Sequence, residues 1–186
     1  MFKPNLYLAL IHYPVISKNG EIIASAVTNL DLHDIARTAR TYDVKGFYVV
    51  TPLEDQRTLV SRILAHWTEG EGARYNPQRG EALALVDIEA NFSDVCRAVQ
   101  AREKRRPQVV ATSARVASGT VSFQGLRDML ATGDPYILAF GTAWGLAEDF
   151  IEATDYVLDP IEGDRDYNHL AVRSAAAIVL DRLVGS

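Results

Sequence analysis

The sequence predicts an α/β fold, in which a mostly parallel sheet is flanked by helices on both faces. Short apolar runs alternate along the chain with segments whose apolar residues recur at helical spacing. The runs show no polar alternation, which is typical of strands that are covered on both faces. With 186 residues, 48% of them hydrophobic, the chain is long enough for a single domain over residues 1–186 without a stabilising disulfide.

The expected elements alternate in order. Continuous apolar runs predict strands at residues 6–11, 46–51, 82–88, 108–112, 136–140 and 156–158. Helical spacing predicts helices at residues 31–42, 55–67 and 93–105, around Leu126 and Leu130, around Leu146 and Phe150, and from Leu170 to Leu183. The pair Asn19-Gly20 predicts a tight turn between two short apolar pairs. Residues 68–80 and 159–169 are expected to be loops.

Composition limits the classes of partner and compartment. The 19 Lys and Arg residues against 24 Asp and Glu give a net charge of −5, so any contact with RNA must be local. Five cations between Arg97 and Arg106 are one candidate, although cations at a helix end also complement the helix dipole. No stretch approaches the roughly 18 apolar residues of a membrane span, and no signal peptide is visible, so we expect a soluble cytoplasmic protein.

Several common functional motifs are missing. The sequence contains no GxxxxGK[ST] phosphate loop, no GxGxxG after an expected strand and no GxSxG nucleophile elbow. Its four histidines are scattered and lack HExxH or paired-cysteine spacing, so no metal site is expected. The standard nucleotide folds, the common hydrolases and a catalytic metal therefore lose support.

Three loops follow the carboxyl ends of expected strands: residues 112–115, 141–146, and 159–163 leading into 168–177. Ligands of open α/β sheets bind at this edge, so three adjacent loops predict one pocket. Gly141, Gly145 and Gly163 would let the backbone approach a ligand closely. The alternative is that these glycines are turn and cap residues and that the Ala-rich run is a tightly packed helix.

These segments resemble a known family. FGTAWGL at 140–146 and DYNHLAVRSAAAIVLDRL at 166–183 are similar to the second and third motifs of the SPOUT superfamily of S-adenosylmethionine-dependent RNA methyltransferases. ARTARTYDVKGFYVV at 36–50 resembles the first motif of its ribose-methylating branch, with Arg37 at the place of the motif arginine and Asp31 at that of an asparagine six positions earlier. The likeness spans the whole chain and is strongest to a small stand-alone bacterial group similar to the tRNA (guanine-N1) methyltransferase fold.

The resemblance implies more than the residues alone do. It implies a C-terminal trefoil knot, S-adenosyl-L-methionine as cofactor, a homodimer paired through the knot region, and an RNA substrate, tRNA or rRNA, rather than DNA. Ala143 stands where relatives often have glycine, and Ala171 stands where they have a polar residue. Since the second motif also lacks the glutamate of many ribose-methylating relatives, base and ribose both stay open as targets.

Roles can then be assigned to residues. By the motif match, Arg37 orients the RNA nucleophile, although it is alternatively a solvated helix charge. A general base needs a carboxylate near the pocket, and Asp164 and Asp166 are the expected ones, with Asp149 and Glu148 also available, although most carboxylates of an acidic chain are simply surface. The expected cofactor-binding residues are Thr112, Ser113, Ala114, Phe140, Gly141, Thr142, Gly145, Leu146, Ile161, Gly163, His169, Leu170, Val172 and Ser174.

Two further side chains have two readings each. Asn168 is expected to cap the last helix, although it could instead contact the substrate. Trp144 either stacks on a base or packs in the interior. Two other function classes stay open beside an RNA methyltransferase: a non-catalytic module that binds S-adenosylmethionine or RNA, and a methyltransferase for a small molecule or protein.

Overall fold

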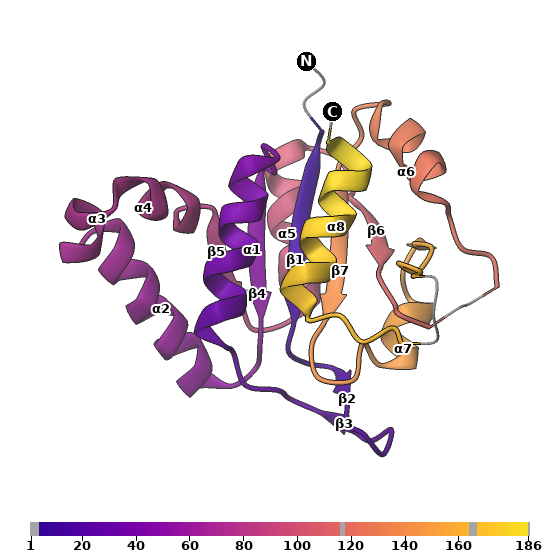
Figure 1. Ribbon diagram of the computed structural model, residues 1–186, viewed down its shortest axis with the longest axis horizontal. Coiled ribbons are helices and arrows are strands. Elements are labelled where there is room, and N and C mark those ends of the chain that lie inside the picture. The colour runs from indigo at the N-terminus through magenta and orange to yellow at the C-terminus, as the bar shows by residue number, and fades with distance from the viewer. Residues whose placement is uncertain (1–3, 116–117, 164–166, 186) are drawn as a thin grey trace.

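Six parallel strands form the central sheet of the computed structural model, which describes residues 4–115, 118–163 and 167–185. Their spatial order is β5-β4-β1-β7-β6-β8, so β1 lies between β4 and β7 (Figure 1). The predicted α/β class with a parallel sheet is confirmed. The strands are β1 (Leu6–Ile11), β4 (Gly46–Val50), β5 (Val86–Glu89), β6 (Gln108–Ala111), β7 (Tyr136–Gly141) and β8 (Tyr156–Val157).

Helices cover both faces of this sheet. Helices α1 and α8 lie side by side on one face, and α5 lies on the other (Figure 1). Each of the predicted helices has a counterpart within a few residues. The helices are α1 (Asn29–Thr41), α2 (Glu54–Thr68), α3 (Glu71–Tyr75), α4 (Pro77–Leu83), α5 (Phe92–Glu103), α6 (Phe123–Leu130), α7 (Glu148–Glu152) and α8 (Val172–Val184).

The predicted loop at residues 68–80 is wrong, because this segment contains α3 and the start of α4. Both helices are too short to show apolar periodicity, and α4 is defined by local capping instead. The Asn76 side chain accepts from the Arg79 amide at 3.1 Å, and Pro77 occupies the first turn. The predicted strand at residues 82–88 therefore begins too early. Ala82 and Leu83 are the last residues of α4, and β5 begins at Val86.

The side chains of β1 alternate between two buried layers. Leu6, Leu8 and Leu10 pack in the cluster that contains the inner faces of α1 and α8. Tyr7, Ala9 and Ile11 pack in a second cluster with residues of α5. Because both faces are covered, the strand is apolar throughout, which explains why the sequence shows no polar alternation.

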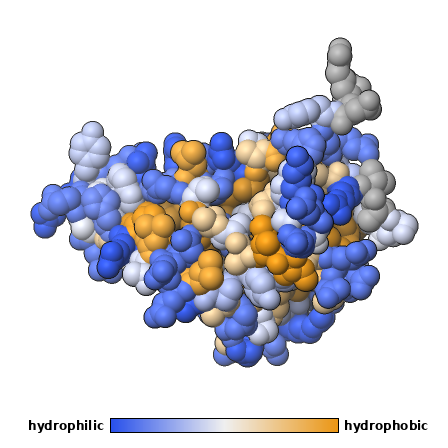
Figure 2. Space-filling model, turned by 90° about the horizontal axis from the view of Figure 1, so that it is seen from below, coloured by the Kyte–Doolittle hydropathy of each residue, from blue (hydrophilic) through white to orange (hydrophobic). Residues whose placement is uncertain are grey.

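The carboxyl ends of the six strands meet at one edge of the sheet, which Figure 2 shows from below. Apolar side chains are exposed across the middle of this face and hydrophilic ones surround them. The antiparallel pair β2 (Val15–Ile16) and β3 (Ile22–Ile23) lies at this edge, with Gly20 at a φ of 83° between them (Figure 1). The predicted Asn19-Gly20 turn is therefore confirmed.

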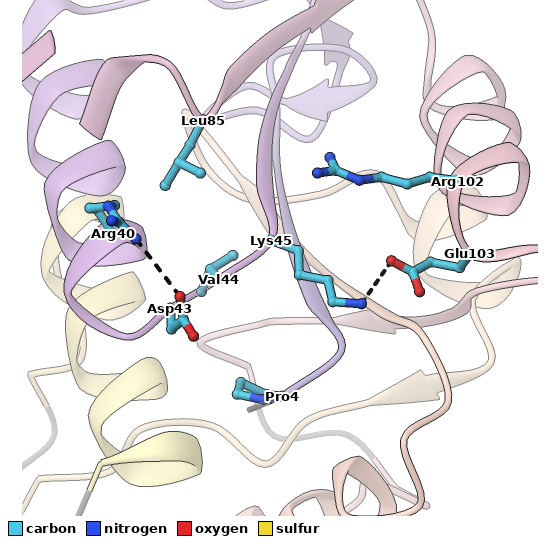
Figure 3. A pocket seen from close by; sticks show the side chains of 8 residues that line it. All are labelled: Pro4, Arg40, Asp43, Val44, Lys45, Leu85, Arg102 and Glu103. Carbon is cyan, nitrogen blue, oxygen red and sulfur yellow. Dashed lines mark hydrogen bonds and ion pairs between the residues drawn. The ribbon is translucent and has the colours of Figure 1, made fainter. Parts of the chain in front are cut away.

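The opposite edge of the sheet is held by Glu103, at the end of α5. Its carboxylate accepts from the Tyr7 hydroxyl, from Lys45 Nζ at 2.9 Å and from Asn5 Nδ2 at 2.9 Å. Burial acts to raise the pKa of Glu103, but these three donors hold it below its ordinary value. A cavity of about 420 Å³ lies here, and Figure 3 shows Lys45 paired with Glu103 beside it.

The charged side chains around the cavity beside Glu103 are largely paired within the protein. Figure 3 shows Arg40 paired with Asp43 and Lys45 paired with Glu103. Arg40 also pairs with Glu81. We therefore interpret this edge as a structural clamp that fixes the amino ends of β1 and β4 to α5.

Replacing Glu103 with alanine should destabilise the protein by about 2–4 kcal/mol, because the Tyr7 hydroxyl loses its acceptor in a mostly buried place and the Asn5 amide keeps only the Gly133 carbonyl. The measurement is urea unfolding followed by circular dichroism. The control is Glu71→Ala, whose ion pair with Arg74 is more than four-fifths exposed on both sides (82% and 81%) and should contribute less than about 0.5 kcal/mol. Equal stability of the two variants would contradict the clamp.

Candidate active site

A cavity of about 810 Å³ opens at the carboxyl edge of the sheet, within the size range of about 300–1,000 Å³ that is typical of ligand pockets. It lies where the strand order changes direction, between the segments that follow β1 and β7. Ligands of open α/β sheets bind at such switch points. The predicted convergence of three loops in one pocket is confirmed, since residues from all three line this cavity.

Most of the predicted cofactor-binding residues line the cavity, while Gly163 and Ser174 are not among its lining residues. Those that line it are Thr112, Ser113, Ala114, Phe140, Gly141, Thr142, Gly145, Leu146, Ile161, His169, Leu170 and Val172. Apolar side chains of this set provide much of the inner surface.

The loop after β7 is fastened to the β2–β3 hairpin. The Trp144 amide donates to the Ile16 carbonyl at 3.1 Å, and the Ile16 amide donates to the Gly145 carbonyl at 3.0 Å. The Ala147 amide donates to the Pro14 carbonyl at 3.3 Å. This loop therefore holds its shape before any ligand binds, and several of its amides serve the protein rather than a ligand.

The geometry of this loop favours the alternative interpretation, in which its glycines are turn residues. A Cβ at Gly141 would lie 2.5 Å from the Leu146 amide nitrogen, so glycine is required for the loop to close on itself. Gly145 has a φ of 110°, which L-residues rarely adopt. Ala143 has a φ of 52°, in the left-handed region, which explains why glycine suits this position in similar sequences.

The predicted catalytic residues are not brought to the cavity by the described part of the chain. Arg37 is exposed on α1 and is not among the lining residues. Asp164 and Asp166 lie outside the described residues. Two arginines line the cavity instead, Arg115 in the loop after β6 and Arg173 in the first turn of α8, and the sequence argument gave neither of them a role.

Two other expectations are resolved by the geometry. The prediction that Asn168 caps the last helix is wrong, because α8 begins at Val172 with Ala171 as its N-cap. Asn168 Nδ2 instead donates to the Ala114 carbonyl at 3.1 Å, which ties two of the loops together. Trp144 is 51% exposed and lies edge-on to His169, so a buried packing role is wrong.

Residues after β1 form a wall of the cavity that the sequence argument did not include. Ser25, Thr28 and Asp31 line it, together with Arg173. The sequence could have indicated this wall, because β1 ends at the same edge of the sheet as the other strands. Ligands of open α/β sheets bind at the carboxyl ends of the strands, so the segment after β1 is expected at the site too. Thr28 caps α1: its Oγ1 accepts from the Asp31 amide at 3.2 Å and donates to Asp31 Oδ2 at 2.6 Å.

A chain of hydrogen bonds supports this wall from below. His12, which has no exposed surface, places Nδ1 2.9 Å from Ser25 Oγ, and Ser25 Oγ also bonds Thr142 Oγ1. Thr142 donates its single hydroxyl hydrogen to the Ile11 carbonyl at 3.0 Å, so Ser25 must donate to Thr142. His12 Nδ1 must then donate to Ser25, which leaves Ser25 able only to accept from a ligand.

The surroundings of His12 Nε2 also favour donation from Nδ1 to Ser25. His12 Nε2 is buried without a hydrogen-bond partner among the described residues. A proton there would be left unsatisfied, so the Nδ1–H tautomer is favoured. Burial lowers the pKa of His12 to about 4, against a weaker opposing effect of the nearby Asp31 charge, so the ring is neutral at neutral pH.

This buried histidine makes stability depend on pH. The unfolded chain binds a proton at His12 near pH 6.5, whereas the folded protein does so only near pH 4, so stability should fall as the pH drops through this window. The loss should approach about 3 kcal/mol. Urea unfolding of wild type and His12→Gln between pH 8 and pH 4 measures it, with the variant expected to show a shallower slope. Parallel curves would show that His12 is not buried in the neutral form.

The basic residues at the end of α5 are mostly paired. Arg97 pairs with Asp94, Arg105 Nη1 lies 2.7 Å from Asp134, and Arg106 Nη2 lies 2.9 Å from Asp155. These ion pairs, which neither interpretation of the cluster foresaw, favour a role within the fold over a free phosphate-contacting patch.

Comparison with known proteins decides the family. A family model described as SAM-dependent RNA methyltransferase matches residues 5–185. The chain belongs to this family. It is 48% identical over 181 residues to a tRNA (guanine-N(1)-)-methyltransferase of Oleidesulfovibrio alaskensis, covering 97% of this chain and 42% of that protein. It is also 40% identical over 184 residues to an uncharacterized protein of Aquifex aeolicus, covering 98% and 90% of the two chains.

The fold of this methyltransferase family member also matches a solved structure. The A. aeolicus TrmH/SpoU tRNA modifying enzyme superposes with a TM-score of 0.55 at 18% identity, covering 97% of this chain and 74% of that one. The resemblance to SPOUT RNA methyltransferases is thus confirmed. The chain spans 42% of the length of the Oleidesulfovibrio methyltransferase.

In residues 4–115, 118–163 and 167–185, no helix has the length and apolar character that crossing a bilayer requires. No three His, Cys, Asp or Glu side chains gather there in a way that would hold a metal ion.

Proposed function

We propose that this protein transfers a methyl group from S-adenosyl-L-methionine to RNA, with tRNA or rRNA as the substrate class. The observation that carries the proposal is the cavity at the switch point of the sheet, in which the three motif-bearing loops converge. Family membership supports the same chemistry. A cofactor-binding module without catalysis and a methyltransferase for other substrates are the competing functions.

The chemistry of the cavity fits the cofactor. Phe140, Leu146 and Ile161 supply apolar surface suited to an adenine ring, while Asp31 and Arg173 supply opposite charges on another wall. The bound cofactor supplies an electrophilic methyl group, and the protein has to hold the nucleophile in line with it. The loop after β7, fastened to the β2–β3 hairpin, gives such a site a fixed shape.

The groups that handle the substrate remain proposals. Exposed Trp144, at the cavity wall, suits stacking of an RNA base. We keep Asp164 and Asp166 as proposed proton acceptors because they stand in the sequence between Ile161 and Asn168, both of which line the cavity. Arg37 is proposed to act from the exposed side of α1 on RNA that extends beyond the cavity.

The assembly is proposed on the same basis. We infer one domain over residues 1–186, a trefoil knot in the C-terminal segment, and a homodimer paired through that region, acting in the cytoplasm where tRNA and rRNA are found. The exposed side of α8 carries small residues, including Ser174, which permit close approach of a second helix.

Light scattering at micromolar concentration tests the dimer. We expect a mass twice the 20.5 kDa of one chain, with or without cofactor. A mass of one chain would contradict pairing through this region.

The function itself is tested by incubating the full chain with tritium-labelled S-adenosylmethionine and total RNA, with protein extract and small metabolites as parallel acceptors. We expect label in a ribonuclease-sensitive fraction. Gly141→Ala should reduce transfer at least tenfold, because the added Cβ displaces the loop after β7. Glu71→Ala is the control, since Glu71 is exposed, pairs only with Arg74 among the described residues and does not line the cavity, and it should keep wild-type transfer.

The other outcomes separate the competing functions. Cofactor binding without transfer would indicate the non-catalytic module, and label in protein or metabolites alone would indicate another substrate class. Full transfer by a folded Gly141→Ala would remove this loop from the site.

A further inference from the structure

Arg173 and Asp31 place opposite charges side by side in the wall of the cavity. Arg173 Nη1 lies 3.1 Å from Asp31 Oδ1, and both residues line the cavity. The pair joins the first turn of α8 to the first turn of α1. Arg173 Nε also lies 3.6 Å from Asp34 Oδ2. The guanidinium is therefore held from two directions and cannot swing freely into solvent.

Arg173 has donors left over after these contacts. A guanidinium carries five N–H donors, and the two contacts with α1 use Nη1 and Nε. Nη2 makes no hydrogen bond with another residue of the described chain. The Arg173 side chain is 36% exposed and lines the cavity. It can therefore donate from Nη2, and from the second hydrogen of Nη1, to an acceptor on a ligand.

The same cavity is also lined by atoms that can only accept. The hydrogen bonds from His12 and to Thr142 leave Ser25 Oγ with a lone pair but no free hydrogen. The orientation of the Asp31 carboxylate is fixed by two hydrogen bonds. The Thr28 hydroxyl donates to Oδ2, and Arg173 Nη1 donates to Oδ1. Each carboxylate oxygen has two lone pairs, so both keep accepting capacity.

The chemistry of this wall matches a zwitterion. A carboxylate needs donors, which Arg173 supplies, and an ammonium needs acceptors, which Asp31 and Ser25 supply. A free phosphate fits less well, because Asp31 and Asp34 leave the group with one net negative charge. We propose that Ser25, Asp31 and Arg173, here called the polar wall, bind the amino-acid end of S-adenosylmethionine.

The inference rests on the proposed function, and it divides the cofactor between two walls. The loops after β6, β7 and β8 hold the nucleoside half, and the polar wall holds the ammonium and carboxylate. Of the three residues of the polar wall, none belongs to the set that the motif resemblance assigned to the cofactor.

Calorimetry with two ligands tests this division. S-adenosylmethionine contains the amino-acid end, whereas 5′-methylthioadenosine contains the same nucleoside and sulfur without it. Arg173→Gln and Asp31→Asn should each weaken S-adenosylmethionine binding at least tenfold and change methylthioadenosine binding less than twofold. Ser25→Ala should show the same selectivity with a smaller loss, of a few fold. Unchanged methylthioadenosine binding also shows that each variant is folded.

A matched control and a third ligand sharpen the result. Arg182→Gln removes an exposed arginine from the same helix, where it lies over the Phe123 ring and does not line the cavity, and should change neither affinity. Decarboxylated S-adenosylmethionine lacks the group assigned to Arg173, so Arg173→Gln should leave its affinity nearly unchanged while Asp31→Asn still weakens it.

Three results would overturn the proposal. Equal loss of both ligands would mean that the polar wall only stabilises the fold. Unchanged S-adenosylmethionine binding with weakened RNA binding would assign Arg173 to the RNA instead. Failure of the wild type to bind S-adenosylmethionine would instead reject the proposed function itself.

Discussion

The place of β1 between two parallel neighbours constrains most of this structure. Because β4 and β7 flank it and helices cover both faces, every side chain of the strand is buried, and only Tyr7 carries a polar atom. The chain leaves β1 toward the hairpin and α1, and it leaves β7 through a loop that folds back onto that hairpin. The cavity lies between these two exits. Packing of the most buried strand thus determines where a ligand can bind.

The two edges of the sheet use polar groups in opposite ways. At the amino edge, Glu103 gathers three donors, and Arg40 and Lys45 have acidic partners, so polar atoms stabilise the fold. At the carboxyl edge, His12, Ser25 and Thr142 form a directed chain that ends with an unused acceptor, and Arg173 retains unused donors. Unmatched groups that are held rigidly distinguish a binding surface from a structural clamp.

The fold was largely predictable because its strands are short apolar runs and its main helices have a clear apolar face. The helices within residues 68–80 were not predicted, because α3 is short and α4 depends on the Asn76 cap rather than on apolar periodicity. The three loops were predictable from their place after strands. Arg173 and Ser25 were not, because their roles arise from contacts between segments distant in sequence, such as the Arg173–Asp31 pair and the Ser25–Thr142 bond. Local spacing also could not show that Gly141 serves loop closure.

The central claim is that the cavity at the carboxyl edge, and no other part of the described chain, receives the cofactor. Hydrogen–deuterium exchange with and without S-adenosylmethionine tests it most directly. We expect the cofactor to slow amide exchange in residues 112–115, 140–146 and 168–175, with no change around Lys45 and Glu103 at the opposite edge. Slowed exchange at the opposite edge alone, or an exchange pattern that the cofactor leaves unaltered, would contradict the claim.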